Sequence, residues 1–299
     1  MEEYKFMKKI LKVKNRIKLY TIFIVSLYLI WMLFNIKIEK KDFIVRNKIF
    51  LENLYSDFST VKISESPVSY TVNTWDQLYN IITSDMYTYD SNTNILTRKT
   101  LNITINSNDT LSVNKKIPIL EWQNVVIIPS EGKTVKLLRD SSYKEAFFDV
   151  EGSLSIGSNN STGNIKLDGN RSSVTSISSL INAKSGTLNL YNNVALINNK
   201  KSSGDGTAGY GGALYVDKAD IYISGSQFEN NEARYGGAIF IDNETSTSKF
   251  NDVCIKNNIA SEGSGGGIYA RGFLEMTGQN TIISGNKAYT YGGRNYDKE

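Results

Sequence analysis

The spacing of hydrophobic positions divides the chain into three kinds of segment. Residues 19–36 form an unbroken apolar run, LYTIFIVSLYLIWMLFNI. As a helix with a rise of about 1.5 Å per residue, this run is roughly 27 Å long, close to the hydrocarbon thickness of a membrane. Residues 74–84 show a helical spacing of apolar positions, whereas from Leu101 onward apolar and polar residues alternate as in β-strands. The pattern predicts a membrane segment, one short helix and a long all-β region.

Positive charge is concentrated before the apolar run. Residues 1–41 hold ten Lys and Arg against three Asp and Glu, and such charges beside a membrane segment keep that end in the cytoplasm. We therefore expect residues 1–18 to be a basic cytoplasmic leader and residues 19–36 a transmembrane signal anchor. The remainder is then expected at the cell surface or outside the cell. A cleaved signal peptide and a buried core helix are the alternatives, although no small-x-small cleavage site follows the run.

Composition limits the chemistry of the remaining chain. The residues after position 41 hold 24 basic and 27 acidic side chains. We exclude nucleic acid as a partner, because a protein that binds it carries basic charge on its folded body. The chain has no histidine and one cysteine, which excludes His-based catalysis, His or Cys zinc sites and intramolecular disulfides. We predict no metal site and no cofactor. The 23 glycines against three prolines favour many tight turns between short strands.

A short helix is predicted before the strands. Residues 74–77 (TWDQ) match the capping-box pattern, in which the threonine hydroxyl and the glutamine side chain bond free backbone N–H groups at a helix start. Leu78, Ile81 and Ile82 follow on one helical face. The predicted organisation is a stalk or linker at residues 37–69, an N-terminal cap with the first coils at residues 70–140, and a repeat array at residues 141–299.

Two short sequence elements recur in alternation over the second half of the chain. The first is an apolar residue three positions before an asparagine, at steps of 27 to 32 residues: Leu167–Asn170, Leu196–Asn199, Phe228–Asn231, Ile255–Asn258 and Ile283–Asn286. The second is a glycine pair at steps of 25 to 29 residues, followed in three copies by an alternating strand: Gly211 and Gly212, Gly236 and Gly237, Gly265 and Gly266, and Gly292 and Gly293. Matches in such regular alternation indicate a repeat architecture.

One such unit is too small to fold alone. Its three or four inward apolar residues contribute about 1.5–3 kcal/mol each on burial, whereas ordering each residue of the unit costs about 1–2 kcal/mol of backbone entropy. Stacked units pair strand on strand at about 4.8 Å and share one core. The copies lack a helical period, which excludes helical solenoids. Their uneven spacing favours a parallel β-helix over a β-propeller, whose period is longer and more regular.

The alternation of apolar and polar residues assigns faces to the repeats. Three aromatic and three charged residues are expected on one outer face: Tyr215, Phe240, Tyr269, Asp217, Asp242 and Arg271. Four asparagines are expected to stack at a corner in left-handed backbone, with amide bonds from coil to coil: Asn199, Asn231, Asn258 and Asn286. The glycine pairs fit a corner where the chain turns sharply or coils approach closely.

The combination of Gly-Gly-Ala-[Ile/Leu] with Phe-x-x-Asn resembles the repeat of the polymorphic outer-membrane proteins and related adhesin-like proteins. The matching segments are Gly211–Leu214 with Phe228–Asn231, then Gly236–Ile239, and the degenerate copies Gly265–Ile268, Ile255–Asn258 and Ile283–Asn286. The resemblance implies a right-handed parallel β-helix displayed on a cell surface, often for adhesion and in some cases at the outer membrane. The chain has no C-terminal β-barrel translocator and stops within or just after a glycine-pair copy, which predicts a truncated array.

Two functions are compatible with the predicted outer face. The leading hypothesis is a non-enzymatic adhesin or binding scaffold that takes a surface glycan or a protein through an exposed aromatic strip. The alternative is a polysaccharide lyase or glycoside hydrolase that uses Asp217 and Asp242, since crowded carboxylates can divide acid and base roles. A third interpretation is purely structural. In it the charged residues are equivalent repeat positions in contact with solvent, and the aromatic residues stack to support strand pairing.

Overall fold

The computed structural model describes most of the chain after residue 61. The described residues are 62–84, 88–90, 95–202, 209–242, 247–289 and 295–296. They belong to one compact unit that begins at Lys62. The predicted leader, the predicted membrane segment at residues 19–36, and the glycine pair at residues 292–293 lie outside the described residues. In the part that the structure describes, no helix is long and apolar enough to cross a membrane.

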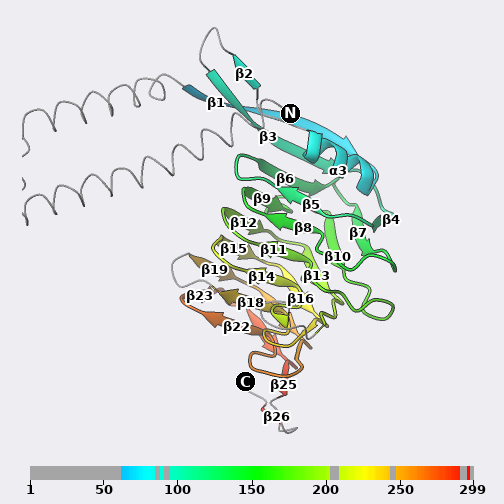
Figure 1. Cartoon of the computed structure of the whole chain (residues 1–299), viewed down its shortest axis with the longest axis vertical. Helices are drawn as coiled ribbons and strands as arrows, with labels where there is room; N and C mark the ends of the chain where they lie inside the picture. The colour runs from blue at the N-terminus through cyan, green and yellow to red at the C-terminus, as the bar shows by residue number, and fades with distance from the viewer. Residues whose placement is uncertain are drawn as a thin grey trace, which may run out of the picture. The chain divides into compact units, whose positions relative to one another are not determined.

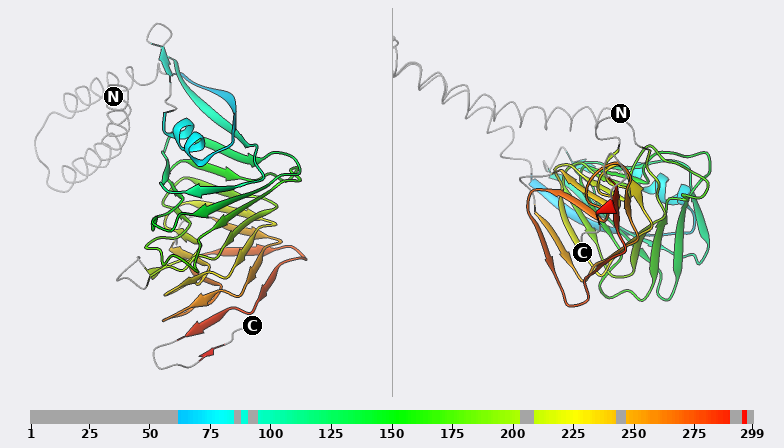
Figure 2. Two further views of the ribbon diagram at one scale, coloured as in Figure 1. Left: turned by 90° about the vertical axis from the view of Figure 1, so that its right-hand side faces the viewer. Right: turned by 90° about the horizontal axis from the view of Figure 1, so that it is seen from below.

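The chain winds through three parallel sheets in a fixed order and forms a β-solenoid of about seven coils (Figure 1, Figure 2). Sheet A contains β1 (Lys62–Val72), β3 (Ile95–Ile105), β6 (Asn124–Pro129), β9 (Ser153–Ile156), β12 (Thr187–Leu190), β15 (Asp220–Ser224), β19 (Ser248–Asn251) and β23 (Leu274–Thr277). Sheet B contains β4 (Thr110–Val113), β7 (Thr134–Arg139), β10 (Asn164–Asp168), β13 (Val194–Ile197), β16 (Gln227–Glu229), β20 (Cys254–Lys256) and β24 (Ile282–Ser284). Sheet C contains β5 (Ile117–Ile119), β8 (Phe148–Val150), β11 (Ile181–Ala183), β14 (Leu214–Val216), β18 (Ile239–Asp242) and β22 (Ile268–Arg271).

Two smaller pairings complete the sheets. Strand β2 (Thr88–Asp90) runs antiparallel to β3. A fourth sheet contains β17 (Glu232–Ala233), β21 (Ile259–Ala260), β25 (Lys287–Tyr289) and β26 (Asn295–Tyr296). Residues 62–69, which the sequence places at the end of a linker, belong to β1 and pair with β3. The predicted all-β class and the parallel β-helix are confirmed.

The coils stack in the register that the repeats predict. Leu167 pairs with Leu196, and Leu196 pairs with Phe228 on the next coil. The column continues through Ile255 to Ile283. Its first four members are fully buried, whereas Ile283, in the last described coil of sheet B, is 50% exposed. Alternate residues therefore fill one continuous core because each strand repeats the inward position of the strand before it.

The predicted short helix, α3 (Trp75–Ser84), covers the first coils. The hydroxyl of Thr74 accepts the N–H of Gln77 at 3.1 Å, as expected of a capping box, whereas Oε1 of Gln77 accepts the N–H of Asn73 at 2.7 Å, one residue before the N-cap residue that the motif would bond. Trp75, Leu78 and Ile82 are buried against the core. The helix thus protects the apolar end that the first coil presents.

A ladder of asparagine side chains joins the coils at the corner after sheet B. The N–H of Asn199 donates to Oδ1 of Asn231 at 3.1 Å, and the N–H of Asn231 donates to Oδ1 of Asn258 at 2.9 Å. The N–H of Asn258 likewise donates to Oδ1 of Asn286 at 2.9 Å. The amides of the last three members also bond back to the preceding coil, as Nδ2 of Asn231 does to the carbonyl of Leu196 at 3.0 Å. The first three asparagines are completely buried, so their amides satisfy backbone groups that water cannot reach.

The left-handed backbone falls one residue earlier than predicted. Positive φ angles occur at Asn198 (54°), Asn230 (57°), Asn257 (56°) and Gly285 (63°), each directly before a ladder asparagine. The prediction that the ladder asparagines themselves adopt this conformation is wrong. The preceding residue makes the sharp turn, for which Asn and Gly have the smallest steric penalty. The ladder residue is then free to direct its amide toward the neighbouring coil.

Arg139 closes the ladder at its N-terminal end. Its side chain is completely buried at the end of β7. Nη2 donates to Oδ1 of Asn199 at 3.2 Å, and Nη1 donates to the carbonyl of Glu145. The ring of Phe147 lies 5.0 Å from the guanidinium carbon, and burial lowers the pKa of Arg139 to about 10. The guanidinium thus donates to Oδ1 of Asn199. In each later asparagine of the ladder, a backbone N–H donates to the same atom.

The glycine pairs at residues 211–212, 236–237 and 265–266 lie one above another. The N–H of the second glycine in the first two pairs donates to the carbonyl of the first glycine on the next coil, at 3.2 and 2.9 Å. The first glycine of each pair has a φ between 59° and 74°. A Cβ added to Gly237 would lie 2.2 Å from the carbonyl oxygen of Gly266. One glycine therefore makes the turn, and the other allows the coils to approach.

Replacing Asn231 by alanine should lower the free energy of unfolding by about 2–4 kcal/mol, because the buried N–H of Asn199 loses its acceptor. Urea unfolding measures the loss. The matched control is Asn189→Ala, which removes one hydrogen bond to the hydroxyl of Ser155 (3.0 Å) on a half-buried outer position. We expect the control to lose less than about 1 kcal/mol. Equal losses in the two variants would contradict the role of the ladder.

Gly237→Ala should destabilise the protein much more than Gly132→Ala. At Gly132 the φ is +67° and a Cβ meets nothing within 4 Å, so alanine costs about 1–2 kcal/mol of backbone strain. At Gly237 the Cβ would also meet backbone atoms of Ile259 at 2.5 and 2.6 Å, which forces neighbouring coils apart. We expect a loss above about 3 kcal/mol in urea unfolding. Similar losses in both variants would contradict the close approach of neighbouring coils at Gly237.

Candidate functional site

The outer face of sheet C carries the residues predicted to bind. Strand pairing aligns the middle residues of its six strands in one column, which we call the sheet C column: Pro118, Asp149, Asn182, Tyr215, Phe240 and Tyr269. On the first five strands the neighbours of the column residue, such as Leu214 and Val216, are buried in the core, so the column points outward. It is polar over the earlier coils and aromatic over the later ones. The three predicted aromatic residues therefore lie on consecutive coils.

Phe240 points outward but is only 1% exposed. The rings of Tyr210 and Tyr269 stack on it, with centroids 4.3 and 4.9 Å away and interplanar angles of 10° and 9°. The ring of Tyr215 lies 6.0 Å from it at 27°. The prediction of an exposed aromatic strip is therefore wrong at Phe240, because the rings around it bury it. Tyr215 and Tyr269 are partly exposed.

Two tyrosines of this cluster were not predicted. Tyr210 and Tyr235 each stand directly before a glycine pair and form a parallel bridge with one another. Their rings meet edge to face at 5.5 Å, and the ring of Tyr235 meets that of Tyr269 at 5.9 Å. The sequence does contain a signal for them, since Tyr-Gly-Gly recurs at residues 210–212, 235–237 and 291–293. Glycine pairs place these rings beside the column because the turn returns the chain to sheet C.

The three predicted charged residues end neighbouring strands of sheet C. Val216 pairs with Ile241, so Asp217 and Asp242 occupy equivalent positions on adjacent coils. Asp242 pairs with Arg271, and Nη1 of the guanidinium lies 3.2 Å from the carboxylate Oδ1. A hydrogen bond with Tyr269 and the charge of Asp242 raise the pKa of Arg271. The structure thus brings Asp242 and Arg271 together as an ion pair, whereas Asp217 forms no ion pair with any described residue.

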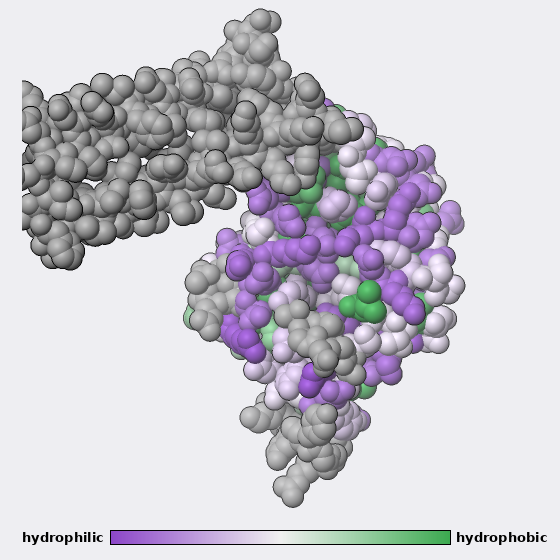
Figure 3. All heavy atoms as spheres, viewed as in Figure 1, coloured by the Kyte–Doolittle hydropathy of each residue, from purple (hydrophilic) through white to green (hydrophobic). Residues whose placement is uncertain are grey.

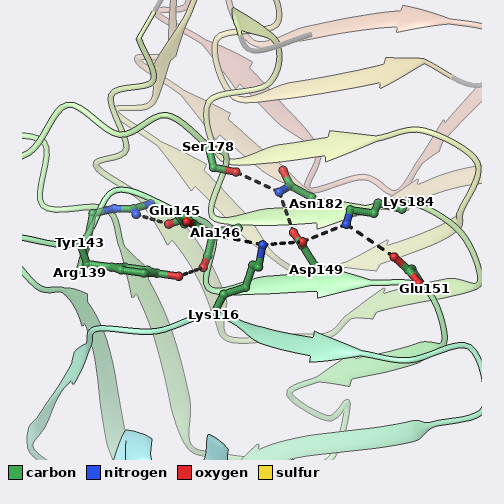
Figure 4. A network of polar contacts seen from close by, with 10 residues as sticks. All are labelled: Lys116, Arg139, Tyr143, Glu145, Ala146, Asp149, Glu151, Ser178, Asn182 and Lys184. Carbon is green, nitrogen blue, oxygen red and sulfur yellow. Dashed lines mark hydrogen bonds and ion pairs between the residues drawn. The ribbon is translucent and has the colours of Figure 1, made fainter. Parts of the chain in front are cut away.

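A polar network continues the column onto the earlier coils (Figure 4). Asp149 accepts Nδ2 of Asn182 at 2.8 Å and lies 3.0 Å from Nζ of Lys116 and 2.9 Å from Nζ of Lys184. Burial acts to raise the pKa of Asp149, but the bonds from Asn182, Lys184 and Lys116 outweigh it and hold that pKa below its usual value. The network was not predicted, because its members come from three coils without a shared sequence motif. It fixes the orientation of the Asp149 carboxylate and of the three side chains that contact it.

A buried lysine lies behind the aromatic cluster. Lys201 is 6% exposed, and its Nζ donates to the carbonyl of Tyr210 at 2.6 Å. The ammonium lies 5.7 Å from the centroid of Tyr215. Burial lowers the pKa of Lys201 to about 8. Nζ also donates to the hydroxyl of Ser179 on the preceding coil at 3.3 Å, so Lys201 joins the backbone before the first glycine pair to that coil and helps to position Tyr210.

Within the described ranges, no three Asp, Glu, His or Cys side chains come together in a way that could hold a metal ion. Comparisons of the chain with protein-family models, with curated proteins and with solved structures find no match. The geometry of the sheet C face therefore carries the functional argument. That face offers phenol, amide and carboxylate groups from several coils, held in place by strand pairing.

Tyr215 should ionise at higher pH than an ordinary tyrosine. Burial raises the pKa of Tyr215 to about 12, and the charges of Asp242 and Asp217 add to this effect. Since the unfolded chain has a tyrosine pKa of about 10, the stabilisation by Tyr215 is complete below about pH 10 and is lost as the pH rises toward 12. Ultraviolet titration of the protein and of Tyr215→Phe gives the difference curve. A midpoint near 10 in that curve would contradict the structure, and Asp242→Asn should lower the midpoint.

Proposed function

We propose that the chain is a membrane-anchored protein of the cell surface whose β-solenoid serves as a non-enzymatic adhesin or binding scaffold. In this proposal residues 19–36 form the anchor, residues 1–18 stay in the cytoplasm, and the solenoid is a right-handed coil like that of the polymorphic outer-membrane proteins. The basic leader and the length of the apolar run support the anchor. The resemblance of the repeats supports display at a surface.

One observation carries the proposed binding role. The inward residues of sheet C fill the core, while the outward column and its flanking charges are held by rings, ion pairs and strand pairing on successive coils. Such a face is rigid, so a ligand that binds it loses little free energy to ordering of side chains. A rigid, partly exposed row of polar groups is what a binding scaffold requires.

The alternative function is a polysaccharide-active enzyme that uses Asp217 and Asp242. Their equivalent positions on adjacent coils favour this reading. The carboxylate of Asp242, however, is already bonded to Arg271, so a sugar that uses it would have to break this ion pair. We therefore favour the scaffold. Release of sugar products by the protein would favour the enzyme, provided that Asp217→Asn and Asp242→Asn abolish it.

The topology can be tested with thiol labelling of intact cells. Cys254 is the one cysteine of the chain, so Cys254→Ser provides a background without thiols. In that background, Lys249→Cys places a thiol at an exposed position of β19. A membrane-impermeant maleimide should label this variant before lysis. Asn15→Cys in the same background is the matched control and should be labelled only after lysis. Labelling of Lys249→Cys only after lysis would overturn the proposal.

A further inference from the structure

The cations of the sheet C face are each paired with a carboxylate. Within one residue of the six strands the face carries three cations and four carboxylates: Lys116, Lys184, Arg271, Asp149, Glu151, Asp217 and Asp242. Both lysines contact Asp149, and the arginine contacts Asp242. The net charge of this set is −1. An acidic polymer would therefore meet surplus carboxylate and would have to break an existing ion pair to reach a cation.

The column presents hydrogen-bonding groups at spacings of one and two coils. Asn182, Tyr215 and Tyr269 are partly exposed members of it, whereas Phe240, between the two tyrosines, is buried and has no polar group. Neighbouring strands lie about 4.8 Å apart, so the two phenols are about 9.6 Å apart along the solenoid axis. In an extended β-1,4-linked sugar chain, successive sugars alternate in orientation, so the same hydroxyls recur at every second sugar, at a spacing comparable to that of the two phenols. An extended peptide does not match, because its side chains on one face recur every two residues, about 6.6 Å.

Apolar surface is scarce on this face. The large hydrophobic side chains that the described residues leave exposed lie outside the strands of sheet C: Ile177, Tyr222, Phe273, Ile282 and Ile283. Phe240 is buried among other rings. Hydrophilic residues also dominate the described part of the side of the molecule shown in Figure 3. Protein interfaces draw most of their binding energy from aromatic anchors in desolvated pockets, which this face does not supply.

We infer that the sheet C face binds a neutral, extended polysaccharide lying along the solenoid axis. The phenol hydroxyls of Tyr215 and Tyr269 and the carboxylate of Asp217 bind sugar hydroxyls, while the stacked rings hold the phenols in place. The inference rests on the proposed binding function and specifies its ligand. The face of the Phe240 ring contributes little to sugar binding, since the rings of Tyr210 and Tyr269 cover it.

The test is retention of the purified full chain, in detergent, on immobilised polysaccharides. The neutral probes are hydroxyethyl cellulose, glucomannan and xylan, and the acidic probes are carboxymethyl cellulose, alginate and polygalacturonate. We expect binding to at least one neutral probe, and weaker binding to carboxymethyl cellulose than to hydroxyethyl cellulose, which has the same backbone. The combined Tyr215→Phe and Tyr269→Phe variant keeps the rings and removes two hydroxyls. It should weaken binding about tenfold or more.

Tyr222→Phe is the matched control, because Tyr222 is 41% exposed on sheet A. It should bind as the unchanged protein does, and equal thermal midpoints show that the variants are folded. The inference is overturned if no neutral probe binds, if acidic probes bind better, or if the tyrosine variant binds normally. Capture of a protein ligand through the same face would overturn it and leave the scaffold proposal intact. Release of sugar products would instead overturn the scaffold proposal.

Discussion

The structure depends on a hydrogen bond between a backbone N–H on one coil and an asparagine side chain on the next. Strand pairing alone joins the flat sheets, but the corners between them turn away from the strand direction and leave backbone groups unpaired. At the corner after sheet B, the side chains of Asn231 and Asn258 each accept such a bond from the neighbouring coil, and both side chains are completely buried. An unpaired group there would cost about 1–3 kcal/mol, so the ladder fixes how far each coil is rotated against the next.

That fixed corner determines the candidate site. The chain leaves the ladder and reaches sheet C through the glycine pairs, and Nδ2 of Asn199 donates to the carbonyl of Gly212. Tyr210 and Tyr235 stand at the same turns. Their rings reach Phe240 and Tyr269 because the glycines place successive turns directly over one another. The aromatic cluster is thus a consequence of the corner geometry as well as of strand alternation.

The sequence predicted the features that depend on local spacing. Alternation and repeat steps predicted the parallel coils, the outward position of Phe240, and an inward column of Leu196, Phe228, Ile255 and Ile283, of which the first three are buried and the last is 50% exposed. Alternation could not predict that Phe240 is buried, because the ring of Tyr210 that covers it comes from a turn 30 residues earlier in the chain. Arg139 was missed for a similar reason. Its role at the end of the ladder arises from Asn199 on a later coil, and a single residue has no period to reveal it.

The outer column shows how this fold separates stability from recognition. Inward positions stay apolar through every described coil of sheet C, from Ile117 and Phe148 to Leu214 and Ile239. Outward positions change from polar to aromatic along the same strands without a change in register. Because alternate residues face opposite sides, the outer face varies without disturbing the core or the ladder. A solenoid can therefore present a surface fitted to a repeating ligand while neighbouring coils retain the contacts that keep them folded.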